Sequence, residues 1–133
     1  MKKSLLKELV LQSLEHERAG IELYETALQC SVNAHLHQAW ERSLAETRSH
    51  EEMLREVCDV LEIDPERDSP GRKAVRRVGS LLVDAVRMAG ANGDAKAAQL
   101  VACGCLVLAE TNESLNWDLL GAIPVAASAE NRP

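Results

Sequence analysis

The tetrapeptide Leu-Ala-Glu-Thr occurs at residues 44–47 and again at residues 108–111, each time inside a long stretch of helix-forming residues. A second helix-forming stretch precedes each copy. This pattern predicts two related helical hairpins that pack together into one four-helix bundle. The alternative is a chance match, because alanine, leucine and glutamate are common throughout the chain.

The composition supports an all-α fold. The chain has 133 residues, which is enough for one domain with a substantial core. Hydrophobic residues make up 46% and charged residues 27%, with only 7 glycines, 4 prolines and no phenylalanine. These values are typical of helices that pack through leucine, valine and alanine, and they do not favour a sheet.

Charge and hydropathy exclude two classes of partner. The formal net charge is −6, and the one basic cluster, within residues 72–77, is small, so we expect neither nucleic acid nor an anionic membrane as a partner. The longest apolar run, Leu100 to Ala109, is about half of what a membrane span needs. Lys7 and Glu8 interrupt the apolar run that a signal peptide would require. We therefore expect a cytoplasmic protein.

The four cysteines do not form a motif. Cys30, Cys58, Cys103 and Cys105 include no Cys-x-x-Cys pair, and Cys103 and Cys105 would point to different faces of a helix. We interpret them as reduced, small hydrophobic residues of the core.

Periodicity and capping residues predict the helices and the domain. The expected helices cover residues 4–30, 34–61, 72–89 and 95–120, with Asn33 and Asp94 as N-caps. The segment from Asp64 to Gly71 contains two prolines and a glycine and is read as a break. The bundle is expected to occupy residues 1–121, followed by a flexible C-terminal tail over residues 122–133.

Polar side chains interrupt the apolar stripe that three of these helices would turn inward. Steps of three and four residues from Val10 along the first helix reach Glu17. The same steps reach His50 on the second helix and Glu110 on the fourth. The stripe of the third helix has no carboxylate. The inward residues expected on the third and fourth helices are Val75, Val78, Leu82, Ala85, Ala89, Leu100, Cys103, Val107, Glu110, Ser114 and Trp117.

Glu17, Glu46, His50, Glu110 and Glu113 are the candidate metal ligands. Ionised side chains are costly to bury unless a partner charge, a hydrogen-bond network or a metal compensates them. Pairs one helical turn apart, such as Glu46 with His50 or Glu110 with Glu113, can face the same ion. Carboxylate and imidazole together suit iron, manganese or zinc. The alternative is that the glutamates are solvated helix charges and that His50 is a hydrogen-bonded core histidine.

The same residues resemble the ferritin-like superfamily. Glu17 followed by Tyr24 is similar to the first helix of bacterioferritins and rubrerythrins, where the glutamate binds metal and the tyrosine lies near the di-iron centre. Glu46 to His50 resembles the helix with their Glu-x-x-His ligand pair. With Met53 to Val57 after it, this segment is closest to small bacterial ferritin-like proteins associated with stress. The resemblance covers residues 5–121 and implies a ferritin-like bundle.

In that family the loop between the second and third helices runs the length of the bundle. We therefore expect residues 62–71 to form such a crossover, although composition equally permits a simple up-down-up-down order. Ten extended residues at about 3.3 Å each can just span a helix of about 30 Å.

The resemblance does not extend to a complete di-iron site. Such a site takes a glutamate from each of two helices and a Glu-x-x-His pair from each of the other two. Thr47 and Ser114 stand where a glutamate and a histidine are expected, and the third helix offers only Asp84, on its polar face. The five candidates could hold one ion, an incomplete pair or none. We expect no two-iron centre and no ferroxidase turnover.

Two functions from different classes are compatible with these residues. In the first, a degenerate carboxylate and histidine centre binds a transition metal, and the protein acts in metal or oxidant handling. In the second, the bundle is metal-free and acts as a structural or protein-interaction module. A homo-oligomer is expected in either case.

Overall fold

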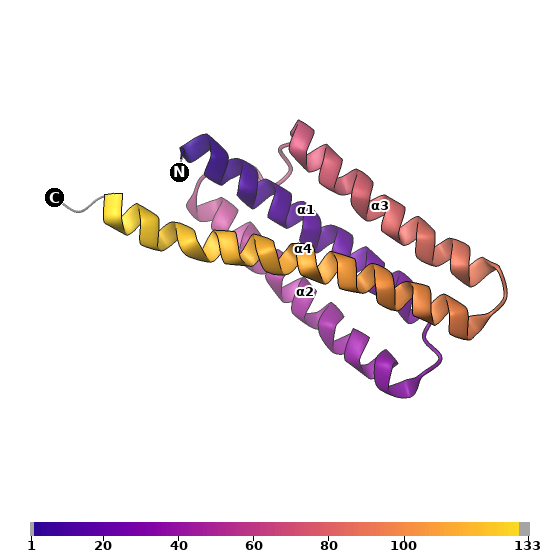
Figure 1. The fold of residues 1–133 in the computed structure, drawn as a ribbon. Helices are drawn as coiled ribbons and strands as arrows, with labels where there is room; N and C mark the ends of the chain where they lie inside the picture. Colours follow the sequence, from indigo (N-terminus) through magenta and orange to yellow (C-terminus); the bar gives the residue numbers. More distant parts are fainter. Residues whose placement is uncertain (1, 131–133) are drawn as a thin grey trace.

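The computed structural model describes the backbone of residues 2–130 and the side chains of residues 2–122. Within that part of the chain there are four helices and no strand, as predicted for an all-α protein. The helices are α1 (Lys3–Leu28), α2 (Ala34–Val60), α3 (Pro70–Ala91) and α4 (Ala95–Glu130). Figure 1 shows that the chain reverses at each loop, so that α1 and α3 run in one direction and α2 and α4 in the other.

Side-chain caps fix where three of the helices begin. The side chain of Asn33 accepts a backbone hydrogen bond from the first turn of α2, and that of Asp94 does so for α4, as predicted. Ser69 caps α3, directly before Pro70, whose fixed φ suits the first helical position. The third helix therefore begins at Pro70 and not at Arg72.

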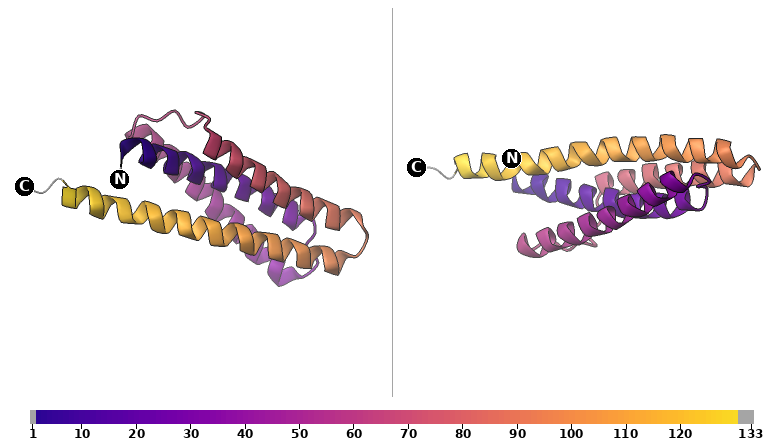
Figure 2. Two further views of the ribbon diagram at one scale, coloured as in Figure 1. Left: turned by 45° about the horizontal axis from the view of Figure 1, so that its top comes forward. Right: turned by 90° about the horizontal axis from the view of Figure 1, so that it is seen from below.

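Helix α1 is the centre of the bundle. It packs against α2, α3 and α4, and α3 also packs against α4. The backbone of α2 approaches that of α1 alone among the described helices. The two views of Figure 2 show α4 lying along α1 and α3 while α2 diverges from α4 toward one end. Because α1 is covered on several sides, both Glu15 and Glu17 are buried although they are only two positions apart.

Two apolar clusters occupy the two ends of the bundle. One surrounds Leu23, Trp40 and Val83, and the other surrounds Leu14 and Leu54. Glu17 lies on α1 between these clusters. A polar layer therefore separates the two parts of the core.

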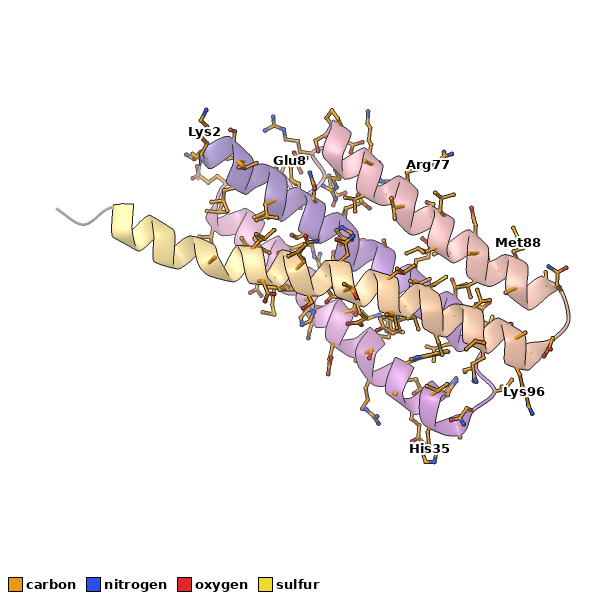
Figure 3. The ribbon with its side chains drawn as sticks, viewed as in Figure 1. Lys2, Glu8, His35, Arg77, Met88 and Lys96 are labelled. Carbon is orange, nitrogen blue, oxygen red and sulfur yellow. The ribbon has the colours of Figure 1, made fainter. Side chains whose placement is uncertain are left out.

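The connection between α2 and α3 differs from the expected crossover. His35 and Lys96 mark the starts of α2 and α4 at the same end of the bundle in Figure 3. Contacts between α3 and α1 also keep the same order along both helices, pairing Gly71 with Gln12, Gly79 with Ala19 and Gly90 with Cys30. Helix α3 is therefore parallel to α1 and antiparallel to α2. The crossover prediction is wrong, since the short loop joins neighbouring helix ends.

Gly79 permits the close approach of α3 to α1. A Cβ atom at this position would lie 2.6 Å from the Cβ of Ala19. We expect Gly79→Ala to lower the free energy of unfolding by about 1–3 kcal/mol through overpacking, although alanine is the better helix former. Gly121, which has open space at its Cβ position, provides the matched control. Urea titration of both variants tests this, and a Gly79→Ala protein as stable as Gly121→Ala would contradict it.

The structure does not confirm the predicted repeat of the two halves. Leu44 and Thr47 are buried against α1, whereas Leu108 and Thr111 are exposed. The two tetrapeptides therefore turn different faces toward the core. Two helical hairpins are present, but their matching tetrapeptides are not structurally equivalent.

The inward face of α4 also differs from the predicted stripe. Leu100, Val107 and Ser114 are exposed, as is Val78 on α3. The residues of α4 that are buried are Ala98, Ala102, Cys105 and Leu106. Small alanine side chains let the α4 backbone lie close to its neighbours. Because α4 is apolar on both sides, periodicity could not show which side faces inward.

Helix α4 continues past its predicted end at Leu120. It includes residues 122–130 of the expected tail, while residues 131–133 lie outside the described part. Alanine, the strongest helix former, occupies four of these nine positions and compensates for Pro124. The expected boundary at residue 121 is therefore not a helix end.

Candidate metal centre

Glu17 is a buried carboxylate in the middle of α1. Its side chain is 1% exposed. The indole Nε1 of Trp117 on α4 donates a hydrogen bond of 2.9 Å to Glu17 Oε1. The second oxygen, Oε2, is buried and has no hydrogen-bond partner among the described residues. Glu17 therefore has an unused ligand atom inside the protein.

His50 and Glu113 complete a three-residue cluster around this carboxylate. His50 Nδ1 lies 2.9 Å from Glu113 Oε1 and 3.7 Å from Glu17 Oε1. One ligand atom from each of the three residues lies within 4.8 Å of the other two. Helices α1, α2 and α4 each contribute one residue. We call Glu17, His50 and Glu113 the three-helix centre.

Trp117 positions two members of the three-helix centre. Its ring centroid is 5.2 Å from that of His50, with the planes tilted by 57°. The same ring forms part of an apolar groove of about 590 Å³ between α1, α2 and α4, together with Val10, Leu54 and Leu120. Trp117 therefore holds Glu17 by its nitrogen, contacts His50 by its face, and stands between the centre and the groove.

The electrostatics of Glu17 follow from its surroundings. The pKa of its carboxyl group is raised to about 8, mainly by burial and also by the charges of Glu113 and Glu110, in spite of the hydrogen bond from Trp117. The ionised form thus lacks a compensating cation. A bound metal ion would supply that positive charge in place of the proton.

Glu15 shows how this chain compensates a buried carboxylate that has a structural role. Its Oε1 accepts hydrogen bonds of 2.9 Å from Arg72 Nε and from Arg76 Nη2. The same Arg72 guanidinium donates to the carbonyls of Pro65 and Arg67, and so ties α1 to the loop before α3. Two arginine side chains therefore compensate the charge of Glu15.

Glu17, two positions along the same helix, has no lysine or arginine partner within the described residues. Its neighbours are instead an imidazole, a second carboxylate and a neutral indole. Imidazole and carboxylate are side chains with which a protein binds a metal ion, and the site is inferred mainly from this contrast with Glu15.

The structure brings together three of the five predicted ligands. Glu110 lies about one turn before Glu113 on α4, and its Oε1 accepts a hydrogen bond from the Tyr24 hydroxyl. Burial and this hydrogen bond raise the Tyr24 pKa. Glu46 is exposed and takes no part. The stripes place His50 in a buried layer with Glu17 and Glu110. In the structure His50 is 35% exposed, and it shares its layer with Glu17 and Glu113 instead.

Sequence reasoning missed two features of this region. Trp117 was placed on the inward stripe of its helix, but its hydrogen bond to Glu17 depends on how α4 crosses α1. The Glu15 network was not predicted either. The signal available for it was a second glutamate close to Glu17 on a helix rich in apolar residues.

No protein-family model matches this chain. No curated protein or solved structure matches it significantly either. The ferritin-like resemblance therefore rests on the sequence motifs alone, and the chemistry of the three-helix centre is the basis for a functional assignment. Within the described residues, no helix is both long and apolar enough to cross a lipid bilayer.

Proposed function

We propose that the three-helix centre binds one divalent transition-metal ion and that the protein acts in metal or oxidant handling. The observation that supports this most directly is the buried, unpartnered Oε2 of Glu17, in a residue that has a ligand atom within 4.8 Å of ligand atoms of His50 and Glu113. Two carboxylates neutralise the charge of a divalent ion, and a neutral imidazole completes a mixed oxygen and nitrogen ligand set. Manganese, iron(II) and zinc accept such ligands.

The ligand count favours a single ion. Glu46 is exposed, Glu110 is held by Tyr24, and Asp84, the carboxylate of α3 considered from the sequence, is exposed. A two-iron site would require ligands from all four helices. The proposed centre is therefore an incomplete relative of the ferritin type, and the proposal does not depend on a ferritin-like connection between α2 and α3.

Access to such an ion would be from the α2 side. His50 is the most exposed member of the centre, Glu113 is less exposed, and Glu17 is enclosed. With three protein ligands, a tetrahedral or octahedral ion would keep one or more positions for water or another small ligand. An open coordination position is what redox chemistry or metal transfer requires.

Metal analysis of the purified protein tests the proposal. Chelator-treated protein is loaded separately with Mn²⁺, Zn²⁺ or, without oxygen, Fe²⁺, and bound metal is measured by elemental analysis and calorimetry. We expect one equivalent per chain with at least one of these ions and no rapid oxygen consumption after iron loading. Failure of all three to bind would leave the metal-free bundle, and two irons per chain with rapid oxygen consumption would identify a working di-iron oxidase.

Matched variants locate the bound ion. Glu17→Gln and His50→Leu each remove one ligand, and loss of a ligand is expected to weaken binding at least about tenfold, by comparison with the 10- to 100-fold typical of outer-sphere changes. Glu46→Gln removes an exposed predicted ligand of the same helix as His50 and is expected to bind like the wild type. Wild-type affinity in both Glu17→Gln and His50→Leu would mean that the ion is bound elsewhere, and an equal loss in Glu46→Gln would mean that the effect is not specific to the three-helix centre.

A further inference from the structure

Helix α4 presents a second apolar face on the side opposite its buried residues. Its members, here called the outer face, are Leu100, Val101, Val107, Leu108, Leu115 and Leu119, and each is between 39% and 73% exposed. Val101, Leu108 and Leu115 recur at heptad spacing, so they form one row along the helix. A helix that is apolar on all sides is normally covered on all sides.

The outer face continues into a groove. Leu108 and Leu115 also line a hollow of about 560 Å³ between α1, α3 and α4, whose other walls include Gly79 and Leu82. The exposed Val78 of α3 belongs to the same hollow. Exposed leucines of α4 therefore lie next to an apolar hollow. A surface with both features can pack against a second copy of itself.

We propose that a second copy of this chain packs on the outer face, with the two α4 helices antiparallel about a two-fold axis near Thr111. This inference is independent of the proposed metal centre, whose residues lie on the opposite side of α4. Leu108 of one copy then lies beside Leu115 of the other, and a leucine from each copy enters the groove of its neighbour.

The outer face is exposed enough to form an interface. Four of its six residues are more than half exposed, and the hollow beside Leu108 and Leu115 adds further apolar surface. A standard interface buries about 800 Å² of each partner, and monomers rarely leave large contiguous apolar patches uncovered. The patch is also free of lysine and arginine, which opposes an anionic lipid surface as its partner.

The charges along α4 select the antiparallel arrangement. Among the charged residues between Leu100 and Leu119, Asp118 alone shares the outward side of the helix, since Glu110 and Glu113 contact α1 and α2 residues. A parallel pair would place the two Asp118 carboxylates opposite each other, which is unfavourable. The antiparallel pair places Asp118 opposite Gly104, where a Cβ position has open space.

Sedimentation equilibrium of the full chain at micromolar concentration tests the interface. We expect the wild type to be a dimer. For Leu108→Lys we expect the Kd of the dimer to rise by about tenfold or more, because the lysine would be desolvated at the centre of the interface. Val60→Lys is the control, since Val60 is more exposed but lies on α2. A monomeric wild type, or a dimer that Val60→Lys dissociates and Leu108→Lys does not, would overturn the proposal.

Cross-linking tests the antiparallel register. Thr111→Cys places a thiol at the proposed two-fold axis and is expected to form a covalent dimer on mild oxidation, faster than the wild type with its own four cysteines. Ala74→Cys on the exposed side of α3 is the control. Equal rates in the two variants would overturn this arrangement. Binding of the monomer to phosphatidylcholine vesicles, measured by cosedimentation, would assign the outer face to lipid and overturn the proposal as well.

Discussion

Replacing Arg72 by methionine is expected to lower the free energy of unfolding by about 3–5 kcal/mol, the usual cost of removing one partner of a buried ion pair. Arg72 is 1% exposed, and its guanidinium pairs with Glu15 and with two loop carbonyls. Methionine keeps most of the volume but leaves the Glu15 carboxylate with the half-exposed Arg76 alone. Urea unfolding at neutral pH measures the difference.

Two controls separate charge from packing in this experiment. Arg87→Met removes an exposed arginine from the same helix and is expected to change stability by less than about 1 kcal/mol. The double variant Arg72→Met with Glu15→Leu removes both buried charges and should regain stability relative to the single variant. A double variant no more stable than Arg72→Met would show that the unpaired Glu15 carboxylate is not the main cost and that the arginine acts mainly through the loop carbonyls.

Glu17→Gln is expected to stabilise the metal-free protein at pH 8.5 and to change its stability little at pH 5. The folded-state pKa of Glu17, about 8, lies above its ordinary value of 4.5. Between these values the folded protein holds a proton that the unfolded chain has lost, so stability falls as the pH rises from 4.5 and the loss is complete above 8. Glutamine resembles the protonated form and does not titrate. The gain at pH 8.5 is of the order of 3 kcal/mol.

Urea unfolding in the presence of a chelator, at the two pH values, measures this gain. With metal present at 1,000 times its Kd the order reverses, because the ion stabilises the wild type by about 4.1 kcal/mol and has no complete site in the variant. Glu46→Gln again serves as the exposed control. A Glu17→Gln effect of equal size at both pH values would show that the carboxylate is not the titrating group.

The sequence was sufficient to predict the helices because their signals are local. Asn33 and Asp94 cap the helices they precede, and the helix boundaries near Leu28 and Val60 follow from the turns after them. The direction of α3 could not be predicted. The nine residues between α2 and α3 permit either a crossover or a turn, and the choice depends on contacts such as Gly79 with Ala19 that join distant parts of the chain.

Local patterns in the sequence also predicted part of the candidate site. Glu17 and His50 lie on stripes with clear apolar neighbours, and the structure brings both to one layer. The sequence offered no basis for deciding which of Glu110 and Glu113 joins His50, since both are on α4 and that helix is apolar on opposite sides. The position of α4 across α1 directs Glu113 to His50 and Glu110 to Tyr24.

The isolation of α2 has a consequence for chain entropy. Its backbone approaches that of α1 alone, so α2 can separate from the other helices without disturbing the packing of α3 on α4. An ion shared by Glu17, His50 and Glu113 would join α2 to α4 across a separation of 63 residues in sequence. It would act as a reversible cross-link that closes a long loop, and such links stabilise most by restricting the opened chain. Release of the ion would then be coupled to local unfolding of α2.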